Sequence, residues 1–308
     1  MILIFDREEK TRLDSYLSEV LEDMSRSHIQ KLIKDGGITV SGKRVKSGYQ
    51  LSGGEEIFVP EEEPEIPEIL PENIPLDIVY EDEDVIVINK PKGMVVHPAA
   101  GHNTGTLVNA LLYHCRDSLS GINGVLRPGI VHRIDMDTTG LLIACKNDRA
   151  HRAIAEQLAE HSITRRYLAL VHGTFSETEG CIDKPIARSE KDRKKMAVAP
   201  LGKGKEAITH YRVLARYRDA SLIECRLETG RTHQIRVHMS SIGHPLFGDC
   251  VYGLKRDRYL AYGQFLHAKV LGFVHPVSGK YMEFSANLPE YFQDVLKKMP
   301  EPELLSEF

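Results

Sequence analysis

The chain has 308 residues, a formal net charge of −4 at neutral pH and 42% hydrophobic residues, so we expect two domains rather than one hydrophobic core. Its five cysteines lie 25 or more residues apart and form no C-x-x-C pair, which argues against a disulfide framework and a structural zinc site. The apolar runs are strand-sized and no leader sequence opens the chain, so we expect a cytoplasmic protein without a membrane span.

Residues 1–59 are predicted to form a small αβ domain. Apolar residues recur at helical spacing from Leu13 to Leu21. A second helix is expected to open at Ser25 and to stop at Gly36-Gly37, and short strands follow from Ile38 to Val59.

Basic residues are concentrated in one part of this small domain. Between Met24 and Gly48 the sequence has six bases and one acid, Asp35. The six bases are Arg26, Lys31, Lys34, Lys43, Arg44 and Lys46. Such a segregated basic face suits phosphate groups; the alternative is an ordinary solvated helix surface.

Residues 60–75 contain six acids, no base and five prolines. Proline interrupts both helices and strand ladders, and like charges keep a chain extended. We therefore expect a linker at 60–75 and a second domain over 76–308.

Strand-like segments dominate the second domain. They are expected at 78–80, 85–88, 141–145, 167–171, 208–213 and 221–225. Helices are expected near 104–115 and 148–160. This order indicates an α+β fold with a mostly antiparallel sheet flanked by helices and loops. The sequence has no G-x-G-x-x-G or Walker pattern, which disfavours nucleotide-cofactor enzymes.

Polar residues are concentrated at 129–140, between two apolar segments. Asp135 or Asp137 could be a nucleophile, a general base, a metal ligand or a turn cap. The neighbouring His132 and Arg133 favour a functional carboxylate, because a nearby cation keeps it ionised.

A second polar segment spans Leu227 to His238. Whether it is a strand or a helix starting after Gly230, Thr232 and Arg236 fall on one side, and together they suit a carboxylate or a phosphate. His233 and His238 are five residues apart, which fits neither the helical nor the strand spacing of a shared metal site.

In a third segment, 164–171, Tyr167 follows two arginines. It is either a tyrosine at the edge of the core or a catalytic residue. The tract from Pro185 to Glu206 has seven bases against three acids, and we expect a mobile loop near phosphates or simply a solvated loop.

Taken together, these segments closely resemble the RluA/RluD-type pseudouridine synthases. The motifs that carry the resemblance are NKPKGMVVHPAAGH (89–102), HRIDMDTTGLL (132–142), RRYLALVHG (165–173), LETGRTHQIRVHM (227–239), GDCVYG (248–253) and FLHAKVLGFVHP (265–276). Residues 12–59 resemble the small RNA-binding domain of a primary rRNA-binding protein of the small ribosomal subunit, an arrangement typical of the D-type branch. Ile134 stands where the family usually has Leu.

The resemblance implies an RNA uridine-to-pseudouridine isomerase that works by base flipping and has a mixed, mostly antiparallel sheet. Asp135 would be the essential carboxylate, acting on C1′ or assisting the departure of uracil, and Arg236 would be its ion-pair partner. Tyr167 would stack on uracil and is a candidate for handling the C5 proton. Arg133 would occupy the space of the flipped base, and Asp137 would have a turn role. The further RNA-contacting residues would be His132, Thr232, Lys195, Arg26, Lys31, Lys34, Lys43 and Arg44. No cofactor or metal is implied. The partner would be structured RNA, with large-subunit rRNA favoured, although related enzymes with the same motifs act on tRNA; a monomer is the default expectation.

Two other classes of protein compete with this interpretation. A metal-dependent nuclease would use His132, Asp135, His233 and His238 as ligands. A catalytically inactive RNA-binding or assembly factor would need the basic faces but not Asp135, Tyr167 and Arg236.

Overall fold

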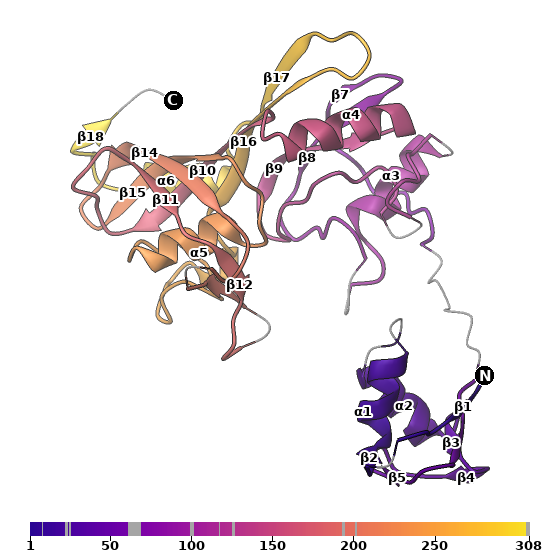
Figure 1. The fold of residues 1–308 in the computed structure, drawn as a ribbon. Helices are drawn as coiled ribbons and strands as arrows, with labels where there is room; N and C mark the ends of the chain where they lie inside the picture. The colour runs from indigo at the N-terminus through magenta and orange to yellow at the C-terminus, as the bar shows by residue number, and fades with distance from the viewer. Residues whose placement is uncertain are drawn as a thin grey trace. The chain divides into compact units, whose positions relative to one another are not determined.

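The computed structural model describes residues 1–305 except 8, 22–23, 25, 61–68, 99–101, 117, 125–126, 193–194 and 201. The chain divides into two compact units, Met1–Ile66 and Pro67–Phe308 (Figure 1). Among the described residues, no helix has both the length and the apolar character needed to cross a bilayer.

The small unit packs two helices against short strands. Its elements are β1 (Ile2–Ile4), β2 (Thr11–Arg12), α1 (Leu13–Val20), α2 (Arg26–Asp35), β3 (Thr39–Val40), β4 (Lys43–Arg44), β5 (Gln50–Leu51) and β6 (Glu56–Phe58). The order β1-β6-β3-β4 forms one antiparallel sheet, and β2 pairs with β5. Both predicted helices are present, although Ser25, the expected start of the second, lies outside the described residues. The helix α2 ends as predicted, because Gly36 adopts a φ of +81° that glycine accommodates without strain.

A buried carboxylate joins α1 to α2. Asp14 is fully buried and accepts hydrogen bonds from Gln30 Nε2 at 2.7 Å, Arg26 Nη2 at 3.2 Å and Arg12 Nε at 3.0 Å. The hydrogen bond from Arg12 is the main reason why the pKa of Asp14 lies well below its usual range, and the bonds from Gln30 and Arg26 add to it. Burial alone would oppose ionisation. Arg26, predicted as an RNA contact, therefore also has a structural partner.

The predicted basic face is accessible. All six bases between residues 24 and 48 are exposed. Five of them, Arg26, Lys31, Lys34, Lys43 and Arg44, lie on α2 or on β4.

The expected linker is only partly a separate segment. Residues 61–68 lie outside the described residues, but Ile69 is buried in the core of the large unit and Ile74 packs against it. Asn109 Nδ2 also donates to the Leu70 carbonyl at 2.8 Å. The second half of the acidic segment thus belongs to the large unit, because its apolar residues find a core there.

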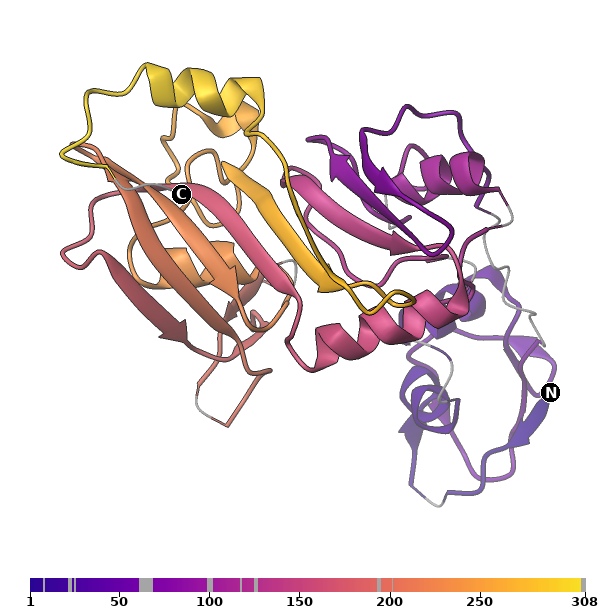
Figure 2. The ribbon, with the colours of Figure 1, turned by 90° about the horizontal axis from the view of Figure 1, so that it is seen from above.

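The large unit is built on a ten-stranded sheet (Figure 2). Its path runs β11 (Glu179–Asp183), β14 (Ile208–Arg216), β15 (Ala220–Leu227), β10 (Thr164–His172), β16 (Leu266–Val274), β9 (Thr139–Cys145), β8 (Val85–Lys90) and β7 (Ile78–Glu81). Off this path, β17 (Tyr281–Ser285) pairs with β16 and β18 (Leu304–Leu305) pairs with β14. The six strands expected from the sequence are all present, and the predicted mixed, mostly antiparallel sheet is confirmed.

In the part of the chain that the structure describes, one pair of neighbouring strands in this sheet, β16 and β9, is parallel. This pair joins the half that runs from β11 to β16 to the half formed by β9, β8 and β7. His267 and Ala268 of β16 lie opposite Thr139 and Gly140 of β9. Gly140 has a φ of +106°, and a Cβ there would lie 2.3 Å from the Ala268 carbonyl oxygen. Only glycine permits this close approach, which explains the glycine at the end of the polar segment.

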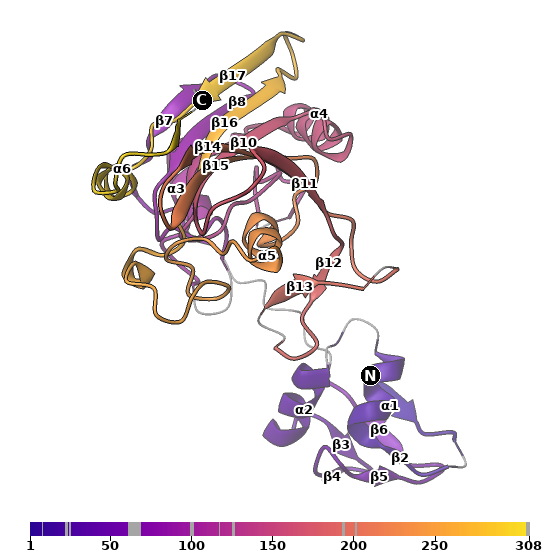
Figure 3. The same cartoon turned by 90° about the vertical axis from the view of Figure 1, so that its left-hand side faces the viewer.

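The helices cover both halves of the sheet. They are α3 (Leu107–Cys115), α4 (Asp148–Ala159), α5 (Gln234–Ser241), the 3₁₀ turn η1 (Leu260–Tyr262) and α6 (Glu290–Lys297). The helix α4 lies across β9 and β16 (Figure 2), and α5 lies beneath the arch of β10, β11, β14 and β15 (Figure 3). The basic tract expected to be a loop instead contains a hairpin of β12 (Ile186–Arg188) and β13 (Met196–Val198).

Candidate active site

The three polar segments of the sequence meet at one cavity of about 520 Å³ in the large unit. Asp135 comes from the loop before β9, Tyr167 from β10 and Arg236 from α5. Apolar side chains complete the wall: Ile134, Leu227, Ile235 and Leu266. A volume of this size is typical of small-molecule and nucleotide sites.

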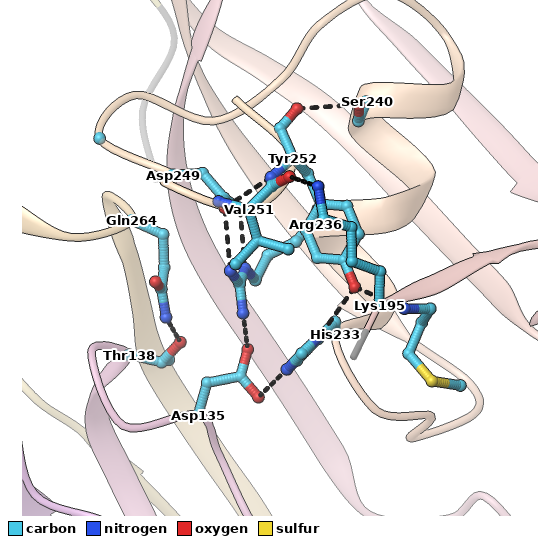
Figure 4. A network of polar contacts seen from close by, with 12 residues as sticks. Asp135, Thr138, Lys195, His233, Arg236, Ser240, Asp249, Val251, Tyr252 and Gln264 are labelled. Carbon is cyan, nitrogen blue, oxygen red and sulfur yellow. Dashed lines mark hydrogen bonds and ion pairs between the residues drawn. The ribbon is translucent and has the colours of Figure 1, made fainter. Parts of the chain in front are cut away.

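The centre of the site is a guanidinium held by two carboxylates (Figure 4). Arg236 Nη1 donates to Asp135 Oδ2 at 2.9 Å. On its other edge, Nε and Nη2 donate to the two oxygens of Asp249 at 2.7 and 2.9 Å. The Arg236 side chain is only 5% exposed, and Asp249 is fully buried. The bidentate bond to Asp249 therefore fixes the plane of the guanidinium and aims its remaining edge at Asp135.

Backbone groups complete the coordination of Asp249. Its Oδ1 accepts from the amides of Val251 and Tyr252 at 2.9 and 3.0 Å. Burial disfavours the charged form of Asp249, but Arg236 and these amides outweigh it and lower the pKa. Burial likewise opposes the charge on Arg236, while both carboxylates raise its pKa above the ordinary value. Arg236 and Asp249 are thus a fixed ion pair, and Asp135 is the carboxylate that faces the cavity.

His233 lies at the N-terminus of α5, 3.8 Å from Asp135 Oδ1 through its Nε2. Its φ of +56° is a strained conformation for a residue with a side chain, and such residues are frequent at functional sites. The Nδ1 atom is hydrogen-bonded to the Tyr252 hydroxyl at 2.8 Å, and that hydroxyl also accepts from the Met196 amide. Burial lowers the pKa of His233. The imidazole is therefore held neutral at neutral pH, beside the carboxylate but not strongly paired with it.

Tyr167 is 7% exposed and lines the cavity. Burial raises its pKa above the ordinary value, the charge on Arg165 opposes this, and Asp135 adds to it. The side chain is therefore a neutral phenol at neutral pH. Base catalysis would need the opposite shift, so this environment favours the stacking role.

The other residues predicted at 129–140 fall into place around Asp135. The Ile143 amide donates to His132 Nε2 at 3.1 Å, and burial lowers the pKa of His132 to about 3. This neutral imidazole ties the polar loop to β9. Exposed Arg133 lines the same cavity and donates to Thr232 Oγ1 at 2.8 Å. Asp137 lies in the turn after Asp135, in agreement with the turn role expected for it.

Lys90 supports the polar loop from behind. It is fully buried, and its Nζ donates to the carbonyls of Pro91, Met94 and Met136 at 2.8, 2.9 and 2.9 Å. Burial lowers its pKa to about 7, although the charges of Asp137 and Asp135 partly oppose this shift. The bond to Met136 fixes the backbone directly after Asp135.

The four ligands of the nuclease interpretation do not gather into one group in the described part of the chain. His132 Nε2 is engaged by Ile143, and both ring nitrogens of His238 are hydrogen-bonded, to Thr209 Oγ1 and the Lys184 carbonyl. The segment from Leu227 forms a helix, as one of its two alternatives predicted, but the helix starts at Gln234. Thr232 lies before the helix and contacts Arg133 rather than joining Arg236 in one donor set.

Several site residues were not singled out from the sequence. Asp249 lies in the GDCVYG motif, which was the available signal for it. Gln234 bonds Thr229, Arg231, Ile208 and Thr209 and so anchors α5 to β14.

Lys195, predicted as an RNA contact, donates to the Val251 carbonyl at 3.2 Å and supports the turn that holds Asp249.

Comparison with known proteins identifies this arrangement. The family model for RNA pseudouridylate synthase matches residues 84–241, and the S4 domain model matches residues 11–57. The chain belongs to the RNA pseudouridylate synthase family. An uncharacterised RNA pseudouridine synthase, YlyB of Bacillus subtilis, is 52% identical over 96% of this chain and 96% of that protein. The ribosomal large subunit pseudouridine synthase D of Zymomonas mobilis is 50% identical over 94% of this chain and 93% of that protein.

A solved structure agrees with this assignment. The human RNA pseudouridylate synthase domain containing 1 has a TM-score of 0.61 and 26% identity, over 76% of this chain and 91% of that chain. The synthase therefore isomerises uridine to pseudouridine in RNA, and its small unit is an RNA-binding S4 domain.

Proposed function

We propose that the synthase modifies uridines of large-subunit rRNA and that Asp135 carries the reaction. In this isomerisation the C1′–N1 bond breaks, uracil turns while it is held, and a C1′–C5 bond forms. Carbon C5 then loses a proton and N1 gains one. The observation that carries the proposal is the 2.9 Å bond between Asp135 and Arg236 at the wall of the cavity.

An anion beside C1′ suits this chemistry, because positive charge develops on the ribose as uracil departs. Arg236 holds Asp135 through the 2.9 Å ion pair and keeps it directed at the cavity. Since Arg236 is itself fixed by Asp249, the carboxylate is oriented before the RNA binds, and little reorganisation is needed during the reaction.

Tyr167 is proposed to stack on uracil as a neutral phenol, a role supported by its burial in the cavity wall. Uracil reaches this cavity only after leaving its helix, and exposed Arg133, which lines the cavity, is proposed to occupy the vacated space. Thr232 holds Arg133 through their hydrogen bond, and His132 holds the loop of Asp135 against β9 by accepting from the Ile143 amide.

Large-subunit rRNA is proposed because relatives that match most of this chain are named ribosomal large subunit pseudouridine synthase D. The basic face of the S4 domain supports binding to structured RNA. We propose that the enzyme acts there as a cytoplasmic monomer.

The first test replaces Asp135 by Asn, which preserves the volume but removes the charge. We expect a folded protein whose conversion of uridine falls at least 10³-fold, measured by mass spectrometry of the RNA. Asp137→Asn is the matched control and should stay within tenfold of the unchanged enzyme. Full conversion by the Asp135→Asn variant would refute the assignment.

The second test maps pseudouridine in total RNA from cells with and without this gene. We expect sites to disappear from large-subunit rRNA, and to return with the unchanged gene but not with Asp135→Asn. Loss of sites from tRNA alone would contradict the rRNA assignment and leave the isomerase activity intact.

A further inference from the structure

Arg165 is a buried cation in the wall of the active-site cavity that has no ionic partner among the described residues. Arg165 precedes Tyr167 by two residues on β10, so both side chains lie on the same face of the strand and both line the cavity. Arg165 is 7% exposed. A buried guanidinium is normally paired with a carboxylate, since losing water around a charge is costly.

The contacts of Arg165 leave most of its donors unused. Its Nη2 donates to the Glu228 carbonyl at 2.9 Å, while Nε is buried and has no hydrogen-bond partner. Nη1 lies beside Gly230, where a Cβ would be only 2.7 Å away. Within the described residues, no carboxylate lies at ion-pair distance from Arg165.

Arg127, Arg133 and Arg231 also line the cavity, but they are exposed or half-buried. Two buried or half-buried arginines nearby are ion-paired. Arg236 is held by two carboxylates. Arg166, the next residue along β10, lies 3.6 Å from Glu224 and 3.2 Å from Glu283. Arg165 is thus the arginine on this strand whose charge is left for something that enters the cavity.

The charges in the cavity match the charge separation of the reaction. As C1′–N1 breaks, both bond electrons stay on N1 and spread to the O2 and O4 atoms of uracil. Positive charge develops on the ribose, where Asp135 is proposed to act. The negative charge on the base needs a cation elsewhere in the cavity, and Tyr167 is within electrostatic reach of both Asp135 and Arg165.

We propose that Arg165 donates a hydrogen bond to a carbonyl oxygen of uracil and stabilises the negative charge of the departing base. The electron pair held there is the pair with which C5 then bonds C1′. This role rests on the isomerisation and on the placement of the ribose at Asp135. It makes Arg165 a catalytic residue, because it contacts the reacting base.

The test pairs enzyme variants with modified substrates in single-turnover reactions with excess enzyme. The variants are Arg165→Met, which removes the charge, and Arg165→Lys, which keeps it. The substrates are three otherwise identical RNAs with uridine, 2-thiouridine or 4-thiouridine at the target position. Sulfur is a weaker hydrogen-bond acceptor than oxygen. The RNA whose sulfur replaces the oxygen that Arg165 contacts should therefore react about tenfold more slowly than the uridine RNA with the unchanged enzyme, and we call this ratio the thio effect.

We expect Arg165→Met to lower the rate on the uridine RNA roughly 10²-fold, with RNA affinity unchanged, and Arg165→Lys to recover part of that loss. In Arg165→Met the thio effect at the oxygen that Arg165 contacts should shrink to less than twofold. The enzyme substitution and the substrate substitution would then be coupled, which a residue with a purely structural role would not produce. Arg166→Met is the matched control and should keep the full thio effect.

Two outcomes would overturn the proposal: a thio effect that persists in full in Arg165→Met, or a rate for that variant within threefold of the unchanged enzyme. The melting temperature of each variant separates both outcomes from unfolding. If the unchanged enzyme converts no uridine in any RNA, the function itself fails; if it converts uridine but shows no coupling, only the role of Arg165 fails.

Discussion

Asp249 is a buried side chain that we propose acts on the reaction through Arg236 without touching the reacting atoms. It lies on the far side of Arg236 from the cavity and accepts four hydrogen bonds, two from the guanidinium and two from backbone amides. An asparagine has one oxygen instead of two and cannot accept all four. The aspartate at position 249 therefore fixes the direction in which the Arg236 guanidinium points.

We expect Asp249→Asn to lower the single-turnover rate about 10²-fold while RNA affinity stays within twofold, because a displacement of about 1 Å at a reacting group can have an effect of this size. Asp257→Asn is the matched control: Asp257 is also buried and accepts from the Gly248 and Tyr259 amides, but it does not contact Arg236. A weaker RNA affinity with an unchanged rate in Asp249→Asn would contradict the positioning role.

At the scale of elements, periodicity in the sequence located the helices near 104–115 and 148–160 and six strands of the large sheet, because these segments bury one face or both. The resemblance supplied the Asp135–Arg236 pair, which local pattern alone left open. What could not be predicted depends on distant contacts. Asp249 reaches Arg236 only after an irregular turn, and the unpaired state of Arg165 is a property of the assembled cavity.

The pairing of α1 and α2 by Asp14 gives a prediction at the same scale. The pKa of Asp14 is depressed in the fold, whereas an unfolded aspartate titrates near about 4. Its contribution to stability is therefore present above about pH 4 and is lost as the pH falls toward the folded pKa.

We expect Asp14→Ala to lower the free energy of opening of α1 and α2 by about 2 kcal/mol at pH 7. Hydrogen exchange on the full chain measures this difference, which should shrink as the pH drops below about 4. Glu19→Ala is the control, since Glu19 lies on the same helix as Asp14 and its one ion pair among the described residues is an exposed one, with Arg7. A difference that does not vary with pH would contradict the role of the charge.

For the whole molecule, the two units divide the work of recognition. The catalytic cavity belongs entirely to the large unit, and the exposed bases of the S4 domain lie in the other unit. Contacts between bases and phosphates release counterions, so they make binding sensitive to salt.

Replacing Lys31, Lys34, Lys43 and Arg44 together by Gln should weaken RNA binding and make the plot of log affinity against log salt shallower by up to about 3. Filter binding between 50 and 200 mM salt measures the slope. The control replaces Lys297 and Lys298 of the large unit, for which we expect no change. Equal slopes for all three proteins would exclude the S4 face as a phosphate-binding surface.

The parallel pairing of β9 with β16 has a consequence for biosynthesis. Asp135 precedes β9, whereas Tyr167 and Arg236 come from the other half of the sheet, and the strand that joins the halves is made of residues 266–274. In a chain that lacks residues 266–274, the Asp135 carboxylate and the Arg236 guanidinium belong to two halves of the sheet that no strand joins. A chain truncated before residue 266 lacks the strand that joins the two halves, and we expect it to bind RNA through its S4 domain but to leave uridines unchanged.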